Sequence, residues 1–162
     1  MSEPRVIEKP LLLYHNDLDS RRELIEGRLL LIDVHLGIIA DTFIATSGLP
    51  GYQSVNQQNL KGKGTIPVPS LAGIPRYRVT TNPISMRLVK GVEGDFFKID
   101  PHGVKVQGVD RGDFGIHRDA NAPGSAGCIV VRNFAAWEVF RQWMQRLDAH
   151  GLNEVPLLVS YS

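Results

Sequence analysis

Short runs of alternating apolar and polar residues recur along most of the chain and are separated by turn formers. They predict strands at residues 28–34, 37–46, 65–68, 76–81, 85–89, 96–100, 104–109 and 155–161. Pairs such as Asn82-Pro83 and Glu93-Gly94 supply the turns between them. Many short strands at this spacing favour a mainly β fold, a sandwich or a barrel, over a sheet built from βαβ units.

One segment near the C-terminus has helical periodicity instead. Its apolar side chains recur at intervals of three and four residues, at Phe134, Trp137, Phe140, Met144 and Leu147. Asn133 is a suitable N-cap, and Gly151 can end the helix. We therefore predict an amphipathic helix that packs its apolar stripe against the sheet.

Two other segments are assigned from polar residues. Ser20 and Glu23 fit a capping box and predict a short helix that ends near Glu26, with an irregular loop as the alternative. Residues 47–64 are polar and predict a long loop, which is either a binding lid or a surface excursion. Residues 1–27 are interpreted as an N-terminal extension and residues 28–162 as one domain.

The composition is that of an ordinary globular chain. It has 162 residues, 43% of them hydrophobic, and a formal net charge of +1. This balance gives no reason to expect a nucleic-acid partner. The apolar runs are too short to span a membrane, and no apolar signal segment follows Met1. The histidines show no metal-ligand spacing, so neither a metal nor a cofactor is predicted.

The candidate chemistry is concentrated in residues 114–133. Cys128 is the only cysteine, and it precedes the β-branched run 129–131, while His117 ends another short apolar segment. Two strand ends joined by a loop could bring His117 beside Cys128 and give the thiol its base. Gly124 and Gly127 permit a turn that aims N–H groups at an oxyanion. The alternative is a buried, inert cysteine.

These residues resemble the signature of the L,D-transpeptidase catalytic domain (YkuD type). Ile116-His117, followed by residues 125–129 (SAGCI), is similar to that family's Ile-His, loop, and Ser/Thr-His-Gly-Cys followed by an apolar residue. Residues 29–48 are similar to its opening hairpin, so the resemblance covers residues 28–162. Ala126 replaces the usual second histidine, Val130 stands where Asn or Arg is usual, and the loop is shorter.

The resemblance implies a mainly β, L,D-transpeptidase-like sandwich or barrel with one helix after the catalytic cysteine. With the residue chemistry, it makes Cys128 the nucleophile and His117 the base. The N–H groups of Gly127 and Cys128 are the candidate oxyanion donors, and Ser125 supports the loop by a hydrogen bond. The resemblance implies that the carbonyl of Arg118 orients the histidine, and the carboxylates of nearby aspartates, Asp113 and Asp119, are alternatives.

Arg118 and Arg132 are the candidate substrate-binding residues, because a guanidinium can hold a carboxylate with two hydrogen bonds. The alternative for each arginine is a solvated surface charge. The substrate that the resemblance implies is a peptidoglycan stem peptide or a muropeptide.

Three functions remain open at this point. The first is a transpeptidase that transfers the acyl group to an amine. The second is a carboxypeptidase or endopeptidase that transfers it to water, in muropeptide recycling, a phage or a toxin. The third is a non-catalytic wall-binding module, against which the intact His117 and Cys128 argue. We expect the protein to be cytoplasmic as made and to reach the cell wall, if it does, by a route other than a signal peptide.

Overall fold

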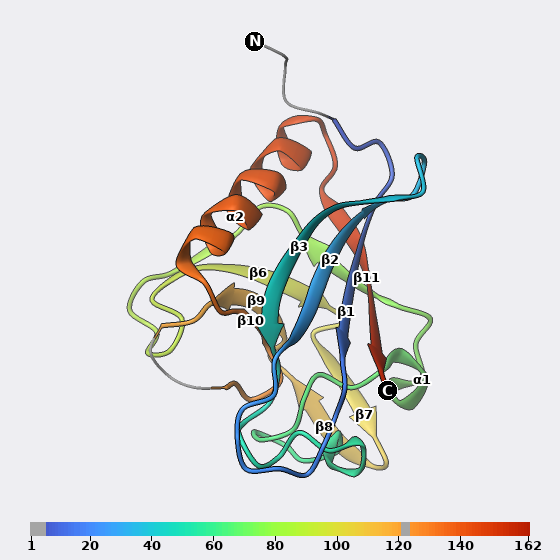
Figure 1. Cartoon of the computed structure of the whole chain (residues 1–162), viewed down its shortest axis with the longest axis vertical. Coiled ribbons are helices and arrows are strands. Elements are labelled where there is room, and N and C mark those ends of the chain that lie inside the picture. The colour runs from blue at the N-terminus through green and yellow to red at the C-terminus, as the bar shows by residue number, and fades with distance from the viewer. Residues whose placement is uncertain (1–5, 121–123) are drawn as a thin grey trace.

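The computed structural model describes residues 6–120 and 124–162, which form a mainly β structure with few helices (Figure 1). Its strands are β1 (Pro10–Asn16), β2 (Gly27–Asp33), β3 (Ile38–Thr46), β4 (Tyr77–Thr80), β5 (Ile84–Met86), β6 (Gly94–Asp100), β7 (Gly103–Val106), β8 (Val109–Gly112), β9 (Gly115–Arg118), β10 (Ile129–Val131) and β11 (Glu154–Tyr161). The mainly β class is confirmed.

Eight of these strands close into a barrel in the order β4-β11-β1-β2-β3-β10-β9-β6, and β6 pairs back with β4. β5 pairs with β6 outside the ring, and β7 and β8 form a separate hairpin. Buried residues alternate with more exposed ones along β1, β2, β4 and β11, because successive side chains of a strand point to opposite faces. Closure of the ring gives each of the eight strands two neighbours.

The N-terminal part of the chain belongs to this ring. Residues 10–16, which the sequence places in an N-terminal extension, form β1 between β2, which is antiparallel to it, and β11, which is parallel. The short helix predicted at residues 20–26 is wrong, since this segment is irregular. Ile25 is buried there and its N–H donates to the Gln53 side chain at 2.8 Å. A side-chain partner from a distant loop thus replaces helical hydrogen bonds, which are marginal in so short a segment.

The strand predicted at residues 65–68 is also wrong. The N–H of Ile66 donates to Ser47 Oγ at 2.8 Å, and that of Val68 donates to Gln58 Oε1 at 2.9 Å. These side chains take the place of a neighbouring strand. A short helix, α1 (Pro69–Ala72), follows with proline at its first position, where the missing N–H has no intrahelical partner to lose.

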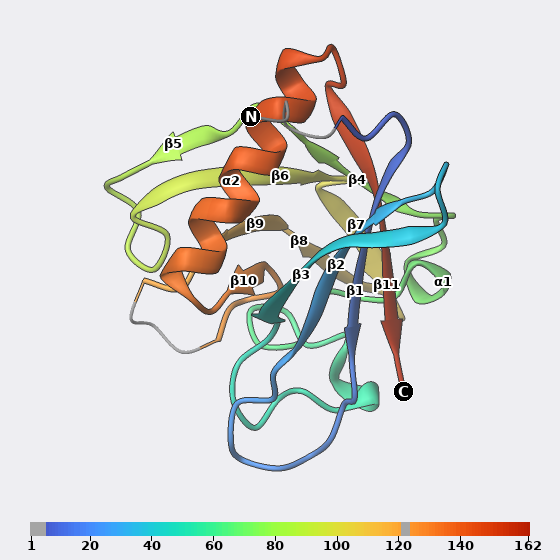
Figure 2. The ribbon, with the colours of Figure 1, turned by 45° about the horizontal axis from the view of Figure 1, so that its top comes forward.

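The predicted amphipathic helix is confirmed as α2 (Phe134–Ala149). The Asn133 side chain accepts a hydrogen bond from the Ala136 N–H at 3.1 Å, as expected of an N-cap. The helix lies near β3, β9 and β10 (Figure 2) and packs against side chains of the barrel's core face. Its buried Phe140 packs edge-to-face with Phe43 at 5.5 Å and Phe97 at 5.4 Å. Within the part of the chain that the structure describes, no helix is long and apolar enough to cross a membrane.

Candidate active site

His117 and Cys128 lie on neighbouring parallel strands. In the β9–β10 register, Ile116 faces Ile129 and His117 faces Val130. Cys128 immediately precedes β10, so it lies diagonally across from His117 on the same face of the sheet. Diagonal neighbours are about 7–8 Å apart at their Cα atoms, within reach of long side chains. The structure therefore places the two residues that the sequence assigned to nucleophile and base on the same face of adjacent strands.

This face is opposite to the core. Ile116 and Ile129 belong to the hydrophobic core, whereas His117 stacks on Phe96, with ring centroids 6.2 Å apart and planes 20° apart. The next residue on β6, Phe97, points to the other face and packs on Trp137 of α2. The site is therefore on the outside of the barrel, with Phe96 as the wall behind the imidazole.

The imidazole has a defined orientation. His117 is only 6% exposed, and its Nδ1 lies 2.8 Å from the Arg118 carbonyl oxygen. A carbonyl can only accept, so Nδ1 carries the proton and Nε2 is the basic nitrogen of the neutral ring. Burial lowers the pKa of His117, although the Arg118 hydrogen bond and the charge of Asp119 oppose this. The side chain is thus a neutral base at pH 7.

The hydrogen bond expected between the His117 imidazole and the Arg118 carbonyl is present. The two aspartates proposed as alternatives to that carbonyl have other side-chain partners. Asp113 Oδ1 lies 3.5 Å from His102 Nε2, and Asp119 Oδ2 lies 3.0 Å from Arg132. Asp119 acts on the imidazole through its charge alone.

The Cys128 thiol is half-buried and protonated at neutral pH. Burial raises its pKa to about 11, against the opposing effect of the Gly115 N–H, and the charge of Asp113 raises it further. The thiol donates to the Asp113 carbonyl at 3.3 Å, and within residues 6–120 and 124–162 no hydrogen bond joins Sγ to the imidazole. The resting pair is therefore a neutral thiol and a neutral imidazole, not a preformed thiolate–imidazolium pair.

Two serine hydroxyls hold the turn before the thiol. Ser125 Oγ donates to the Cys128 carbonyl at 2.6 Å and accepts from the Gly48 N–H at 3.2 Å. The support predicted for Ser125 is therefore present as a hydrogen bond. Ser47 Oγ, which is fully buried, donates to the Gly127 carbonyl at 3.2 Å.

These contacts direct the N–H groups of the turn. In a planar trans peptide, the N–H points opposite to the preceding carbonyl, so the Cys128 N–H points away from Ser47. The Gly127 N–H lies 3.4 Å from Ser125 Oγ and already has that partner. Of the two oxyanion donors predicted from the sequence, the Cys128 N–H is the one that the serine hydroxyls leave free. Gly127 adopts φ 120°, a conformation that favours glycine.

Sequence reasoning missed Ser47 and Arg111. Arg111 on β8 is only 2% exposed and donates to the carbonyls of Gly64 at 3.0 Å and Thr65 at 3.1 Å, and to that of Gln58. Its Nη2 also lies 3.4 Å from the Ala126 carbonyl oxygen. No local pattern marks either residue, because their partners are distant in the sequence.

The polar loop at residues 47–64 is observed, and it contains the short 3₁₀ helix η1 (Val55–Gln57). Gln53 is fully buried in it and donates to the Ser47 carbonyl at 2.8 Å and the Ile25 carbonyl at 3.2 Å. The Ser125 N–H donates to the Gly48 carbonyl at 3.0 Å. The buried part of the loop therefore supports the cysteine turn, while residues 61–63 are exposed.

The two candidate substrate-binding arginines already have acidic partners. Arg132 lies 3.0 Å from Asp119 and 3.7 Å from Glu26, and Arg118 lies 4.0 Å from Glu93. The Arg118 side chain lines a cavity with residues of α2, on the face of β9 opposite to His117. That position separates its guanidinium from the thiol, and the binding role of Arg132 stays a prediction.

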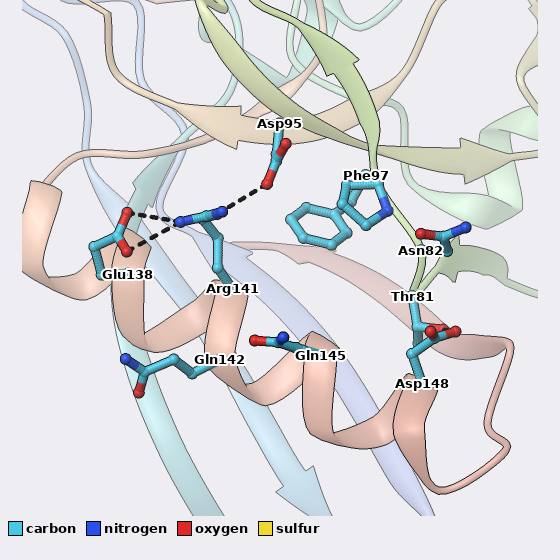
Figure 3. A pocket seen from close by; sticks show the side chains of 10 residues that line it. Thr81, Asn82, Asp95, Phe97, Glu138, Arg141, Gln142, Gln145 and Asp148 are labelled. Carbon is cyan, nitrogen blue, oxygen red and sulfur yellow. Dashed lines mark hydrogen bonds and ion pairs between the residues drawn. The ribbon is translucent and has the colours of Figure 1, made fainter.

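A larger cavity of about 480 Å³ lies between α2 and β6 on the same face as Arg118 (Figure 3). Arg141 crosses it from α2, with its Nε 2.9 Å from Asp95 and its Nη1 3.0 Å from Glu138. Phe97 is part of its lining, so the sheet separates the cavity from Phe96 and His117. Among the described residues, no group of three or more His, Cys, Asp or Glu side chains is placed to hold a metal ion.

No family model matches this chain, and a search of curated proteins finds no match. The resemblance to L,D-transpeptidases therefore rests on the motif residues.

Proposed function

We propose that the protein is a cysteine acyl-transfer enzyme, L,D-transpeptidase-like, that acts on peptidoglycan stem peptides. The observation that carries the proposal is the placement of Cys128 and His117 on one outer face of β9 and β10, with Nδ1 at the Arg118 carbonyl. A histidine held in this way presents Nε2 as a base towards its own face of the sheet. The substrate class comes from the sequence motif alone.

In this mechanism, Sγ attacks a peptide carbonyl while Nε2 of His117 takes the thiol proton. Because the resting thiol has a raised pKa and the imidazole a lowered one, proton transfer accompanies the attack rather than preceding it. The Cys128 N–H donates to the oxyanion that forms on the carbonyl oxygen. The imidazolium then protonates the leaving amine, and a thioester with Cys128 remains.

The second half of the reaction reverses these roles. Nε2 removes a proton from the acceptor as it attacks the thioester carbonyl, and the thiol leaves with that proton restored. An amine acceptor gives a cross-linked peptide, and water gives a shortened peptide. Both products would arise from the same thioester with Cys128.

The test is incubation of the purified protein with a disaccharide tetrapeptide, followed by mass analysis. Hydrolysis yields the tripeptide, and transpeptidation yields a cross-linked dimer. Cys128→Ala should abolish both products, whereas Arg141→Lys, which alters a half-buried arginine on the opposite face, should retain them. Product formation by Cys128→Ala, or no product from the wild type with tetrapeptide or pentapeptide donors, would refute the proposal.

A further inference from the structure

Arg111 is a buried cation without a carboxylate partner among the described residues. Its guanidinium donates hydrogen bonds to backbone carbonyls of three segments: Gln58, Gly64 with Thr65, and Ala126. Burying an arginine this completely is costly unless its donors are satisfied, and a planar fork of five N–H groups suits several carbonyls at once. Two of the four carbonyls, those of Gln58 and Gly64, belong to the polar loop, and that of Thr65 directly follows it. The fourth belongs to the turn before the nucleophile.

The contact with Ala126 fixes one peptide of that turn. With the Ala126 carbonyl directed at Arg111, the Gly127 N–H points the other way, where Ser125 Oγ receives it. The fit at Gly127 is close, since a Cβ added there would lie 2.7 Å from Nη2 of Arg111. The absence of a side chain at Gly127 therefore lets the guanidinium reach the turn.

Arg111 also acts on the next peptide, through Ser47. By holding the carbonyls of Gly64 and Thr65, it places the following residue, Ile66, whose N–H donates to Ser47 Oγ at 2.8 Å. The hydroxyl oxygen is then occupied as an acceptor, so its own proton is directed at the Gly127 carbonyl. The same guanidinium thus holds the Ala126–Gly127 peptide directly. It holds the Gly127–Cys128 peptide, which carries the Cys128 N–H, through the Thr65–Ile66 peptide and Ser47.

We propose that Arg111 is the positioning residue of the oxyanion site: it fixes the Ala126–Gly127 and Gly127–Cys128 peptides so that the Cys128 N–H points at the substrate oxygen. This role rests on the proposed acyl-transfer function in that it requires Cys128 to attack a carbonyl. It does not depend on the stem peptide as substrate.

Two reactions of the Cys128 thiol distinguish a loss of N–H positioning from a loss of folding or of thiol reactivity. Acylation by p-nitrophenyl acetate forms an S–C bond and expels p-nitrophenolate through a tetrahedral oxyanion, with the thiol proton taken by His117. Alkylation by iodoacetamide displaces iodide at a saturated carbon and forms no oxyanion. Only the first reaction needs a correctly aimed N–H donor.

Arg111→Lys keeps the positive charge but loses the planar set of N–H donors that reaches several carbonyls at once. We expect it to slow acylation by about 10- to 100-fold, since a misplacement near 1 Å can cost about 100-fold, and to change alkylation by less than about twofold. Arg141→Lys, the matched control on the opposite face, should leave both rates unchanged. Equal loss of both rates in Arg111→Lys, or no loss in either, would overturn the assignment, as would failure of the ester to acylate the wild type.

A second variant covers the case in which Arg111→Lys does not fold. Gly127→Ala places a methyl group 2.7 Å from Nη2 of Arg111 and 2.9 Å from Cε1 of Phe114, at a residue whose φ of 120° favours glycine, and should give the same selective loss of acylation. A Gly127→Ala protein with an unchanged ratio of acylation to alkylation would refute the role of Arg111. Because the ester is not a stem peptide, a negative result with muropeptides would count against the substrate proposal and leave this test intact.

Discussion

Gly115→Ala tests whether Phe96 positions the imidazole. Gly115 lies on β9, two residues before His117, and the Phe96 ring occupies the space where a side chain would be. A Cβ at residue 115 would lie 2.0 Å from Cζ of Phe96 and 2.3 Å from Cε2, which no real contact allows. The ring is 5% exposed and stacks on His117, so it must shift against the catalytic side chain.

The size of the effect follows from this overlap. Overpacking of a well-packed site costs about 1–3 kcal/mol, which lowers the melting temperature of a domain of this size by roughly 2–12 °C. Gly103→Ala is the matched control, because its Cβ would meet only the Arg111 carbonyl oxygen at 3.8 Å, an ordinary contact. A tolerated Gly→Ala change stabilises by about 0.4–1 kcal/mol through the unfolded state, so the control should be neutral or slightly stabilising.

The assay is thermal unfolding together with acylation by p-nitrophenyl acetate. Gly115→Ala should lower both the melting temperature and the acylation rate, and Phe96→Leu in the same background should restore part of the stability by removing the clash. The double-mutant cycle should show a coupling of about 0.5–3 kcal/mol between residues 96 and 115. Equal melting temperatures for Gly115→Ala and Gly103→Ala, with no coupling to residue 96, would refute this reasoning.

Two further predictions concern pH. Because burial raises the pKa of Cys128 to about 11, iodoacetamide should alkylate the wild type slowly at pH 7 and about tenfold faster per pH unit towards that value; a rate that is already maximal at pH 8 would contradict this. Burial also raises the pKa values of Tyr14, Tyr77 and Tyr161, so the folded state retains phenol protons that the unfolded state loses. Their contribution to stability is complete below about pH 10 and is lost above it, so the urea midpoint should fall there; a midpoint that stays constant to about pH 11.5 would contradict this.

The sequence by itself determined the local elements. Periodicities and short apolar or β-branched runs are properties of neighbouring residues, and they located β2, β3, β4, β6, β9, β10, β11 and α2. The N-cap at Asn133 and the hydrogen bond from Ser125 to the Cys128 carbonyl are also local, since each spans three residues. The candidate nucleophile and base could be named because a single thiol preceded by a glycine-rich turn, and a histidine at a strand end, are visible in the linear pattern.

The tertiary structure decided what depends on partners far apart in the chain. Closure of β6 onto β4 and the insertion of β1 beside β11 are pairings that no local pattern specifies. The wrong predictions at residues 20–26 and 65–68 share this cause, because distant side chains replaced the hydrogen bonds of a helix or a strand. Ser47 and Arg111 were missed because their roles exist only when the polar loop packs on the cysteine turn. The protonation of Cys128 likewise follows from burial, which is a property of the folded chain.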